Sequence, residues 1–512
     1  MHIFLYGPVG VGKSTVGKIL ARNLNLPFID SDHVIETNAG GSIFEIMTQQ
    51  GEVAARDLET TALKQIVNHK ESVIALGGGA LLRDENRALV GNNGRVIFLA
   101  ADLDTLRGRL DSDSNKRPLL AGDLSEKLTS LLARRKEHYD SFPLRFDANQ
   151  APERLAWQIQ VALGRFHLSA MGAYDVVVQK GGIDDLGQRL KSCELQNPIV
   201  VTDPNIAQFH AEHVVASLEN AGFDSKTVLL PPGETHKNLD TVSQLWKSFL
   251  NSGLDRKSTV IALGGGVIGD LAGFAASTYM RGIPWVCVPT TLLSMVDASL
   301  GGKTGFDLPE GKNLIGSFYP PKLVLADPQV LSTLPEAEFV SGLAEVVKHG
   351  IISDPELFDL CSHGLECVQA DLEQIVKRAM AVKVKIIEGD PYEKGFRAAL
   401  NVGHTVGHAV ELVSKFQLRH GEAVAIGMVA EAKLAERLTV ATKGLSDMIT
   451  GGLSALGLPI DIPQNLPREE IVQTMRVDKK KNAIAIRFAL PAEIGRVELV
   501  DITDLESVLE ES

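Results

Sequence analysis

A glycine-rich run near the N-terminus restricts more than any other feature what this chain can fold into. Residues 7–15 read GPVGVGKST, which fits the pattern GxxxxGK[ST]. The run follows the apolar segment Ile3–Tyr6 and precedes the amphipathic segment Val16–Asn23, so a strand, a loop and a helix are expected in that order. Backbone N–H groups of such a loop wrap phosphates at a helix N-terminus, where the helix dipole favours anions. The sequence therefore predicts a nucleotide-binding α/β domain.

The residues of this loop differ in what they offer a nucleotide. Gly10 and Gly12 let the backbone approach the phosphates closely. The Lys13 ammonium would neutralise β- and γ-phosphate charge, and the Ser14 hydroxyl would help to hold Mg²⁺. Thr15 completes the set expected to contact the nucleotide. By itself the motif predicts nucleotide binding and nothing narrower.

Further motifs narrow the reaction. They are, in chain order, Asp30 and Asp32 after the apolar segment Leu26–Ile29, the run GEVAARDLE at 51–59, the glycines Gly77, Gly78 and Gly79 after the segment Ser72–Leu76, Lys116 with Arg117, and Arg135 four residues before Tyr139. In this order and spacing, residues 1–166 resemble shikimate kinase. The resemblance implies a P-loop kinase domain with a parallel sheet that uses ATP with Mg²⁺.

The resemblance also implies a role for each motif. Ser14 and Asp30 would support Mg²⁺, and Asp32 would orient, and help to deprotonate, the accepting hydroxyl. A guanidinium grips a carboxylate with two hydrogen bonds, which suits Arg56 and Arg135 to the acid group of shikimate. Arg117 would reach the transferring phosphate from a lid. The residues implied for shikimate are Asp32, Arg56, Gly77, Gly78, Gly79 and Arg135.

Two departures from the family pattern lie near the expected substrate pocket. Ala55 stands where the family usually has Phe before the substrate arginine. Lys136, Glu137 and His138 precede Tyr139 where the family usually has a sequence like Asn-Pro-Leu. An alternative therefore stays open for this half, namely nucleotide binding without shikimate turnover.

A second alternation of apolar and amphipathic segments follows and predicts another α/β domain. Buried strands are expected at residues 175–179, 198–202, 226–230, 259–263 and 285–289, and from about residue 326 the chain turns mostly helical. We predict a P-loop domain at 1–166, a linker at 167–174, a Rossmann-like NAD-binding subdomain at 175–325 and a mostly α-helical metal-binding subdomain at 326–512.

Two groups of residues in this second half carry chemistry. Gly264, Gly265 and Gly266 follow the expected strand 259–263, and glycine at this place lets a pyrophosphate approach the start of a helix. Glu345, His404 and His420 offer one carboxylate and two imidazoles, which leaves coordination positions open on a Lewis-acid metal. A lone histidine is more often a hydrogen-bonded core residue, but the glycines flanking His404 and His408 weaken that interpretation.

Over residues 175–512 the chain resembles 3-dehydroquinate synthase, in motifs that are dense and in register. The resemblance implies NAD⁺ and either Zn²⁺ or Co²⁺, with Glu345, His404 and His420 as ligands and His408 as a nearby catalytic group. The residues implied for the dinucleotide and its loop are Asp203, Asn205, Glu234, Lys237, Gly265, Gly266, Asp270, Thr290, Thr291, Asp297 and Lys312.

The implied substrate is 3-deoxy-D-arabino-heptulosonate 7-phosphate, whose carboxylate and phosphate call for a cation-rich pocket. The residues implied for substrate binding and catalysis are Lys303, Asn313, Lys348, Lys383, Glu393, Arg397, Asn401 and Lys479. Arg281 is expected to reach the site of a neighbouring subunit, so a homodimer is implied. Another sugar-phosphate cyclase stays open as an alternative; a metal-dependent polyol dehydrogenase lacks such a clamp of cations.

The composition of the chain limits which molecules it can bind and in which compartment it can work. The formal net charge of −13 argues against non-specific binding to nucleic acid or to anionic membranes, while a local group of lysines can still bind small anions. The four cysteines form no CxxC pair, which fits a reducing compartment. The N-terminus runs straight into a strand, leaving no room for a signal peptide, and no uncharged apolar run reaches the length of a membrane span. We therefore expect a cytoplasmic enzyme.

Overall fold

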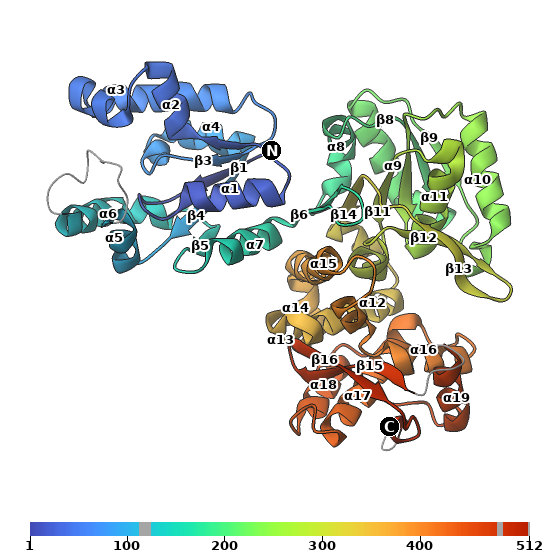
Figure 1. The fold of residues 1–512 in the computed structure, drawn as a ribbon. Coiled ribbons are helices and arrows are strands. Elements are labelled where there is room, and N and C mark those ends of the chain that lie inside the picture. The colour runs from blue at the N-terminus through green and yellow to red at the C-terminus, as the bar shows by residue number, and fades with distance from the viewer. Residues whose placement is uncertain (112–123, 479–484, 510–512) are drawn as a thin grey trace. The chain divides into compact units, whose positions relative to one another are not determined.

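The computed structural model describes residues 1–111, 124–478 and 485–509 and divides the chain into two compact units, Met1–Leu163 and Gly164–Ser512. Each unit is built on its own sheet, which is parallel throughout in the first unit and mostly parallel in the second (Figure 1). The first unit contains the phosphate loop, and the second contains the glycines at 264–266 and the expected metal ligands Glu345, His404 and His420.

The sheet of the first unit is parallel throughout, with the strand order β2-β3-β1-β4-β5. Its strands are β1 (His2–Tyr6), β2 (Phe28–Asp30), β3 (Val73–Ala75), β4 (Gly94–Ala100) and β5 (Arg145–Asp147). Its helices are α1 (Lys13–Asn23), α2 (Ser31–Ala39), α3 (Ile43–Ile66), α4 (Asp84–Asn93), α5 (Leu103–Asp111), α6 (Leu124–Asp140) and α7 (Pro152–Leu163).

Strand β1 is buried along its whole length because both faces of this sheet are covered, and it is apolar from Ile3 to Leu5. Ile3 and Leu5 point to one side, where they pack with α1 and α7, whereas Phe4 and Tyr6 point to the other side. Figure 1 shows α1 and α7 on one face of the sheet, and α3 and α4 on the opposite face. The strand expected at residues 3–6 is thus confirmed as β1, and the segment Ser72–Leu76 before the glycines contains β3.

The second unit contains a seven-stranded sheet with the order β6-β7-β14-β11-β10-β8-β9. Its strands are β6 (Arg165–Leu168), β7 (Tyr174–Val178), β8 (Gln196–Thr202), β9 (Lys226–Leu229), β10 (Ser258–Gly264), β11 (Trp285–Pro289) and β14 (Leu323–Ala326). The helices that accompany them are α8 (Leu186–Ser192), α9 (Pro204–Asn220), α10 (Leu239–Asn251) and α11 (Gly266–Thr278). A separate hairpin joins β12 (Lys303–Leu308) to β13 (Gly311–Phe318).

The residues predicted as a linker at 167–174 instead form the end of β6, the turn that follows it and the first residue of β7. Strand β6 pairs antiparallel with β7, with His167 opposite Asp175 and Leu168 opposite Tyr174. Phe166 and Leu168 are buried, so these residues belong to the core of the second unit. The predicted boundary at residue 166 accordingly moves to Leu163, where α7 ends.

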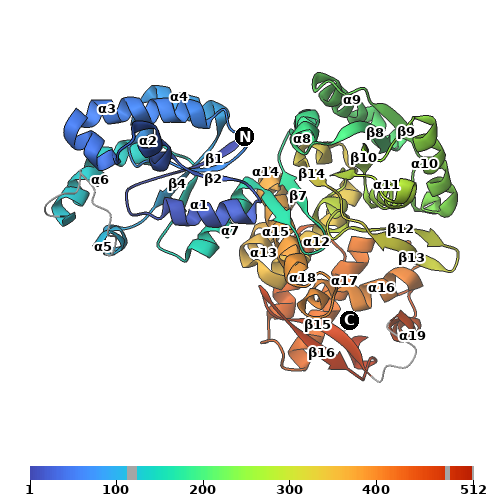
Figure 2. The same ribbon diagram turned by 45° about the horizontal axis from the view of Figure 1, so that its top comes forward.

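The rest of the second unit is mostly helical, as predicted. Its helices are α12 (Glu336–Ser353), α13 (Pro355–Ser362), α14 (Leu365–Ala370), α15 (Leu372–Gly389), α16 (His404–Val413), α17 (His420–Arg437), α18 (Leu445–Ala455) and α19 (Arg468–Asp478). An antiparallel hairpin of β15 (Ile486–Glu493) and β16 (Arg496–Ile502), which the sequence did not predict, packs against α17 and α12 (Figure 2).

Helix α12 is the buried centre of this helical part, with every residue from Ser341 to Ile352 buried. It therefore holds the charged side chains of Glu345 and Lys348 inside the protein. Within the described ranges, no helix is long and apolar enough to cross a membrane.

Candidate active sites

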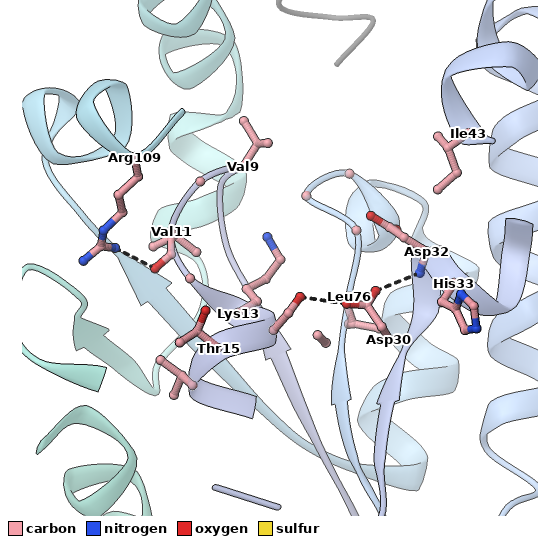
Figure 3. Close-up of a pocket in the computed structure, with 18 of the residues that line it drawn as sticks. Val9, Val11, Lys13, Thr15, Asp30, Asp32, His33, Ile43, Leu76 and Arg109 are labelled. Carbon is pink, nitrogen blue, oxygen red and sulfur yellow. Dashed lines mark hydrogen bonds between the residues drawn. The ribbon is translucent and has the colours of Figure 1, made fainter. Parts of the chain in front are cut away.

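The phosphate loop lines a cavity of about 1340 Å³ in the first unit, together with the segments that follow β2 and β3 (Figure 3). Helix α1 begins at Lys13, and Gly12 precedes it with a φ of 98°, a conformation that glycine adopts without strain. A Cβ on Gly7 would lie 2.3 Å from the Leu99 carbonyl oxygen, so this position also requires glycine. The Lys13 ammonium donates to the carbonyls of Gly7 and Pro8, each at 3.0 Å.

Two carboxylates meet this loop from the end of β2. The Ser14 hydroxyl donates to Oδ2 of Asp30 at 2.7 Å, and the backbone N–H of Asp32 donates to Oδ1 of Asp30 at 3.2 Å. Asp30 therefore caps α2 and also faces the loop, as Figure 3 shows. Because hydroxyl and carboxylate oxygens are the ligands that Mg²⁺ prefers, the Ser14–Asp30 pair fits a hydrated magnesium ion beside the phosphates.

Arg56 lies against the backbone of the glycine run after β3. Its Nη1 donates to Oε2 of Glu59 at 2.5 Å, and its Nη2 donates to Glu52 at 3.1 Å. A Cβ on Gly79 would come within 2.4 Å of the guanidinium, so glycine is required for this approach. Burial raises the pKa of Glu59 although Arg56 opposes that shift, and the Glu59 carboxylate raises the pKa of Arg56 against the effect of burial.

Arg135 reaches the same glycine run from α6. Its Nη1 donates to the Gly78 carbonyl at 2.7 Å, and the Tyr139 hydroxyl donates to that carbonyl at 2.9 Å. Tyr6 lies behind them, with its hydroxyl 3.1 Å from Nε2 of His138. The two arginines predicted for the substrate carboxylate thus both line this cavity, with Gly77–Gly79 beside them.

Arg117 and Lys479 lie outside the described residues. Arg109, which the sequence analysis missed, lines the cavity and donates to the carbonyls of Val11 and Ala148 at 2.9 and 2.8 Å. Its position on α5 is seen clearly in Figure 3, but no motif around it distinguishes it from a surface arginine in the sequence.

In the second unit, the glycine run after β10 forms the start of α11, with Gly265 at the cap and Gly266 as the first helical residue. Near this helix, Lys237 is buried and its ammonium lies 2.6 Å from Asp270 and 2.6 Å from Oδ1 of Asn313. Asp270 raises the pKa of Lys237, although burial works to lower it. Lys237 and Asp270, predicted for the dinucleotide and its loop, and Asn313, predicted for the substrate, therefore lie in one polar group.

The remaining predicted dinucleotide residues occupy simpler positions. Asp203 caps α9 by accepting from the backbone N–H groups of Asn205 and Ile206 at 2.8 and 3.3 Å. The Thr290 N–H donates to the Gly264 carbonyl at 3.0 Å, and the Thr291 hydroxyl accepts from the Ser294 N–H at 3.1 Å. The side chains of Asn205 and Glu234 are exposed.

Glu345, His404 and His420 converge from three helices, α12, α16 and α17. Oε1 of Glu345 lies 3.4 Å from Nε2 of His404 and 3.6 Å from Nε2 of His420. Both Glu345 oxygens are buried and, among the described residues, accept no hydrogen bond of ordinary geometry. One carboxylate and two imidazole nitrogens around one point match the donor set of a divalent transition metal, so these residues fit such an ion.

His408 stands beside this group, with a ring nitrogen within 4.8 Å of those of His404 and His420. The structure therefore places a third imidazole beside the two expected histidine ligands, where a nearby catalytic group would have to lie. Glu411, one turn further along α16, lies 3.2 Å from Nδ1 of His420 and 3.9 Å from Nζ of Lys312. Lys312 thus connects the β12–β13 hairpin with the helices that carry the histidines.

The two expected histidine ligands differ in how their surroundings affect protonation. Burial, followed by the charge of Lys348, lowers the pKa of His404 to about 3. Burial acts in the same direction on His420, but Glu345 and Glu411 outweigh it and raise the pKa of His420 to about 10. For Glu345, burial acts to raise the pKa, but Lys348, His404 and His420 together outweigh burial and hold the pKa well below its usual value.

Cationic side chains surround this group, each beside an acid. Lys348 pairs with Glu345, and Lys383 pairs with Asp297 and also donates to its carbonyl at 2.7 Å. Lys303 Nζ lies 2.7 Å from Oε1 of Glu393, and Arg397 Nε lies 3.4 Å from the same oxygen. Burial lowers the pKa of Lys383 although Asp297 opposes the shift.

Asn401 and Arg281 have exposed side chains, and Arg281 has a φ of 69°. Glu411 and His349 are site residues that the sequence analysis missed. Glu411 follows His404 and His408 at helical spacing, which could have revealed it. His349 is fully buried beside Asp297 and Glu345, but no signal beyond its place next to Lys348 identifies it.

Family models match residues 9–163 and 227–481 of the chain. The model described as shikimate kinase matches residues 9–163, 3-dehydroquinate synthase N-terminal matches 227–341, and 3-dehydroquinate synthase C-terminal matches 342–481. A curated 3-dehydroquinate synthase of Nostoc punctiforme is 44% identical over 337 residues, which cover 64% of this chain and 93% of that protein.

The chain is also similar to solved structures. A 2-deoxy-scyllo-inosose synthase complexed with carbaglucose-6-phosphate, NAD⁺ and Co²⁺ is 26% identical, with a TM-score of 0.62, and covers 68% of this chain and 99% of its own. A shikimate kinase of Acinetobacter baumannii in complex with shikimate is 37% identical, with a TM-score of 0.30, and covers 32% of this chain and 92% of its own.

Proposed function

The chain belongs to the 3-dehydroquinate synthase family and carries a shikimate kinase domain ahead of it, and from this premise we propose which residues perform the two reactions. The chain is a fused enzyme of the shikimate pathway, with a kinase activity and a lyase activity. The kinase converts shikimate and ATP to shikimate 3-phosphate. The synthase converts 3-deoxy-D-arabino-heptulosonate 7-phosphate to 3-dehydroquinate and phosphate.

In the kinase unit, the loop residues Gly10, Gly12, Lys13 and Thr15 would hold the phosphates of ATP, while Ser14 and Asp30 hold Mg²⁺. Asp32 lines the same cavity and would orient the accepting hydroxyl. Arg56 and Arg135 would bind the substrate carboxylate beside Gly77–Gly79. The support for this division is that both arginines contact the glycine run, away from the Ser14–Asp30 pair.

In the synthase unit, the observation that carries the proposal is the convergence of Glu345, His404 and His420 at 3.4 and 3.6 Å. We place Zn²⁺ or Co²⁺ there, and NAD⁺ at the start of α11 with Asp270 and Lys237 nearby. When bound, the metal would polarise the substrate oxygens and NAD⁺ would accept and return a hydride.

The side chains of this unit would bind and orient the substrate around those groups. Lys348 and Lys383 are buried beside acids, so they are held in place before the substrate arrives. Lys303, Asn313 and Arg397 would complete the binding of the substrate's two anionic ends, with Asn401 and Lys479 assigned by the family pattern. His408 would move a proton beside the histidine ligands.

The enzyme is further proposed to act as a homodimer through its synthase unit and to work in the cytoplasm. Arg281 supports the dimer, because its exposed side chain, in the short 3-10 turn that follows α11, is available to a second subunit. The partners are small anionic molecules, in line with the clustered lysines of an otherwise acidic chain.

The test is phosphate release from the heptulosonate phosphate by the purified full-length chain, with and without chelator, repeated with His404→Ala. Metal-dependent release with formation of 3-dehydroquinate, abolished in the variant, is expected. Kinase turnover of shikimate by the same variant should be unchanged, because His404 lies in the other unit. No phosphate release by a wild-type chain loaded with NAD⁺ and metal would overturn the assignment of the substrate.

A further inference from the structure

We propose that Glu431 is a positioning residue for the metal ligand His404 and acts on it through the peptide group that joins Val402 to Gly403. The proposal rests on the metal site assigned above, since it concerns how one ligand of that site is held. Glu431 lies on α17, within a stretch of the helix whose other residues are almost all apolar. It is completely buried, with an exposed fraction of 0%.

One peptide group connects the two side chains. Its N–H, from Gly403, donates to Oε2 of Glu431 at 2.5 Å. Its C=O, from Val402, lies 3.1 Å from Nδ1 of His404. A carbonyl can only accept, so Nδ1 of His404 must carry the proton. The other ring nitrogen, Nε2, is thereby left with its lone pair on the side of Glu345, 3.4 Å away.

The turn at the start of α16 gives this peptide its direction. Val402 has φ −53° and ψ 126°, and Gly403 has φ 76° and ψ −12°, which are the angles of a type II turn. A Cβ on Gly403 would lie 2.7 Å from the Val424 carbonyl oxygen and 2.6 Å from Cγ of Met428. Glycine therefore permits both the turn and the close approach of α17, which brings Glu431 to the peptide.

The buried charge of Glu431 is stabilised by the helix that it caps. Its Oε1 lies 3.5 Å from the backbone N–H of Val406, so both oxygens face N–H groups of the first turn of α16. An ionised carboxylate accepts at both oxygens, and the positive end of the helix dipole favours it. Hydrogen bonds in such a series polarise one another, so the charge increases the acceptor strength of the Val402 carbonyl toward His404.

The second ligand has a simpler version of the same support. His420 places its Nδ1 3.2 Å from Oε2 of Glu411 without an intervening peptide. A carboxylate behind a ligating imidazole fixes its orientation and raises its basicity, and loss of such a partner typically weakens metal binding by about 10–100-fold. Each histidine ligand is thus connected to its own carboxylate, directly for His420 and through one peptide for His404.

The test measures binding of Co²⁺ to the metal-stripped full-length chain by its visible absorption, in the wild type, Glu431→Gln and Glu436→Gln. Glu436 is the matched control, since it lies on the same helix and its Oε1 accepts from the Gly444 and Ser446 N–H groups at 3.0 and 2.7 Å, at the start of α18. Both substitutions remove a carboxylate from a helix N-terminus, so both should lower the midpoint of thermal unfolding of the metal-free protein.

We expect Glu431→Gln to weaken Co²⁺ binding by about 10–100-fold and to shift the absorption bands, with Glu436→Gln within about twofold of the wild type. Equal Co²⁺ affinity and equal spectra in the two variants, despite lowered stability, would show that Glu431 only caps a helix and would overturn the proposal. If the wild type binds no Co²⁺ and His404→Ala changes nothing, the metal site itself fails, and the role of Glu431 fails with it.

Discussion

The hydroxyl of Tyr6 lies 3.1 Å from Nε2 of His138, which joins the end of β1 to the end of α6 inside the kinase unit. The same hydroxyl lies 3.4 Å from the Gly78 carbonyl, which also accepts from Arg135. His138 belongs to one of the two departures from the family pattern. His138 thus has Tyr6 as its hydrogen-bond partner, and Arg135 stays in contact with the glycine run.

We expect Tyr6→Phe and His138→Leu to be coupled. Each single substitution leaves one polar atom of the pair without its partner, so each should raise the KM for shikimate more than it changes kcat. The double variant should be less impaired than the sum, with a coupling of about 0.5–1.5 kcal/mol. A double-mutant cycle on kcat/KM checks this, and strict additivity would contradict a working hydrogen bond.

Protonation of His138 should weaken the kinase unit in acid. Burial, followed by the charges of Arg87 and Arg135, lowers the pKa of His138, and Asp84 opposes the shift. The unfolded chain then binds the proton more readily than the folded chain, so stability falls as the pH drops below the unfolded value of about 6.5. Thermal unfolding from pH 8 to 5 should show the wild type losing more stability than His138→Leu; parallel profiles would exclude this.

Ala55→Phe, which restores the residue usual in the family, should destabilise this protein. Ala55 is 4% exposed and packs in a small core with Ile35, Ile46 and Ala62, so a phenyl ring has no space. Overpacking of this kind costs about 1–3 kcal/mol. The thermal midpoint of the kinase transition measures the cost. Val53→Phe serves as the control because Val53 is 72% exposed, and a midpoint unchanged in both variants would disprove the packing argument.

The two acids that pair with Arg56 should differ in importance. The Glu59 side chain is 12% exposed and that of Arg56 is 11%, whereas Glu52 is 58% exposed. Glu59→Gln should therefore cost about 1–3 kcal/mol and raise the KM for shikimate, because Arg56 loses a buried charged partner. Glu52→Gln should stay within about 0.5 kcal/mol. Equal losses of stability in Glu59→Gln and Glu52→Gln would mean that burial does not decide which of the two acids matters more to Arg56.

Much of the fold could be predicted because its central strands are long apolar runs. Strand β10 is buried at every residue, and its pattern admits few other interpretations. The β12–β13 hairpin could not be predicted, since β13 is largely exposed and carries no apolar alternation toward a core. Strand β6 did carry an alternating signal in Phe166 and Leu168, but four residues are too few to separate a strand from a linker.

The residues of the two sites also divide into those that could be predicted from the sequence and those that could not. Residues inside motifs, such as Lys13 and His404, could be selected because a loop or a helix fixes their spacing in the sequence. Glu431 could not, because its contact with Gly403 arises from the packing of α17 on α16, far away along the chain. Side chains that support a site from a neighbouring helix become visible only when tertiary packing is known.

The end of the kinase unit at Leu163 governs how the two enzymes can be separated. A truncated synthase that begins at residue 175 would lack β6, and the unpaired N–H and C=O groups of β7 would face solvent at the border of its sheet. Such a border recruits other chains and promotes aggregation. A cut between Leu163 and Gly164 keeps β6 with its partner, so it should yield a soluble synthase where a later cut yields a precipitate.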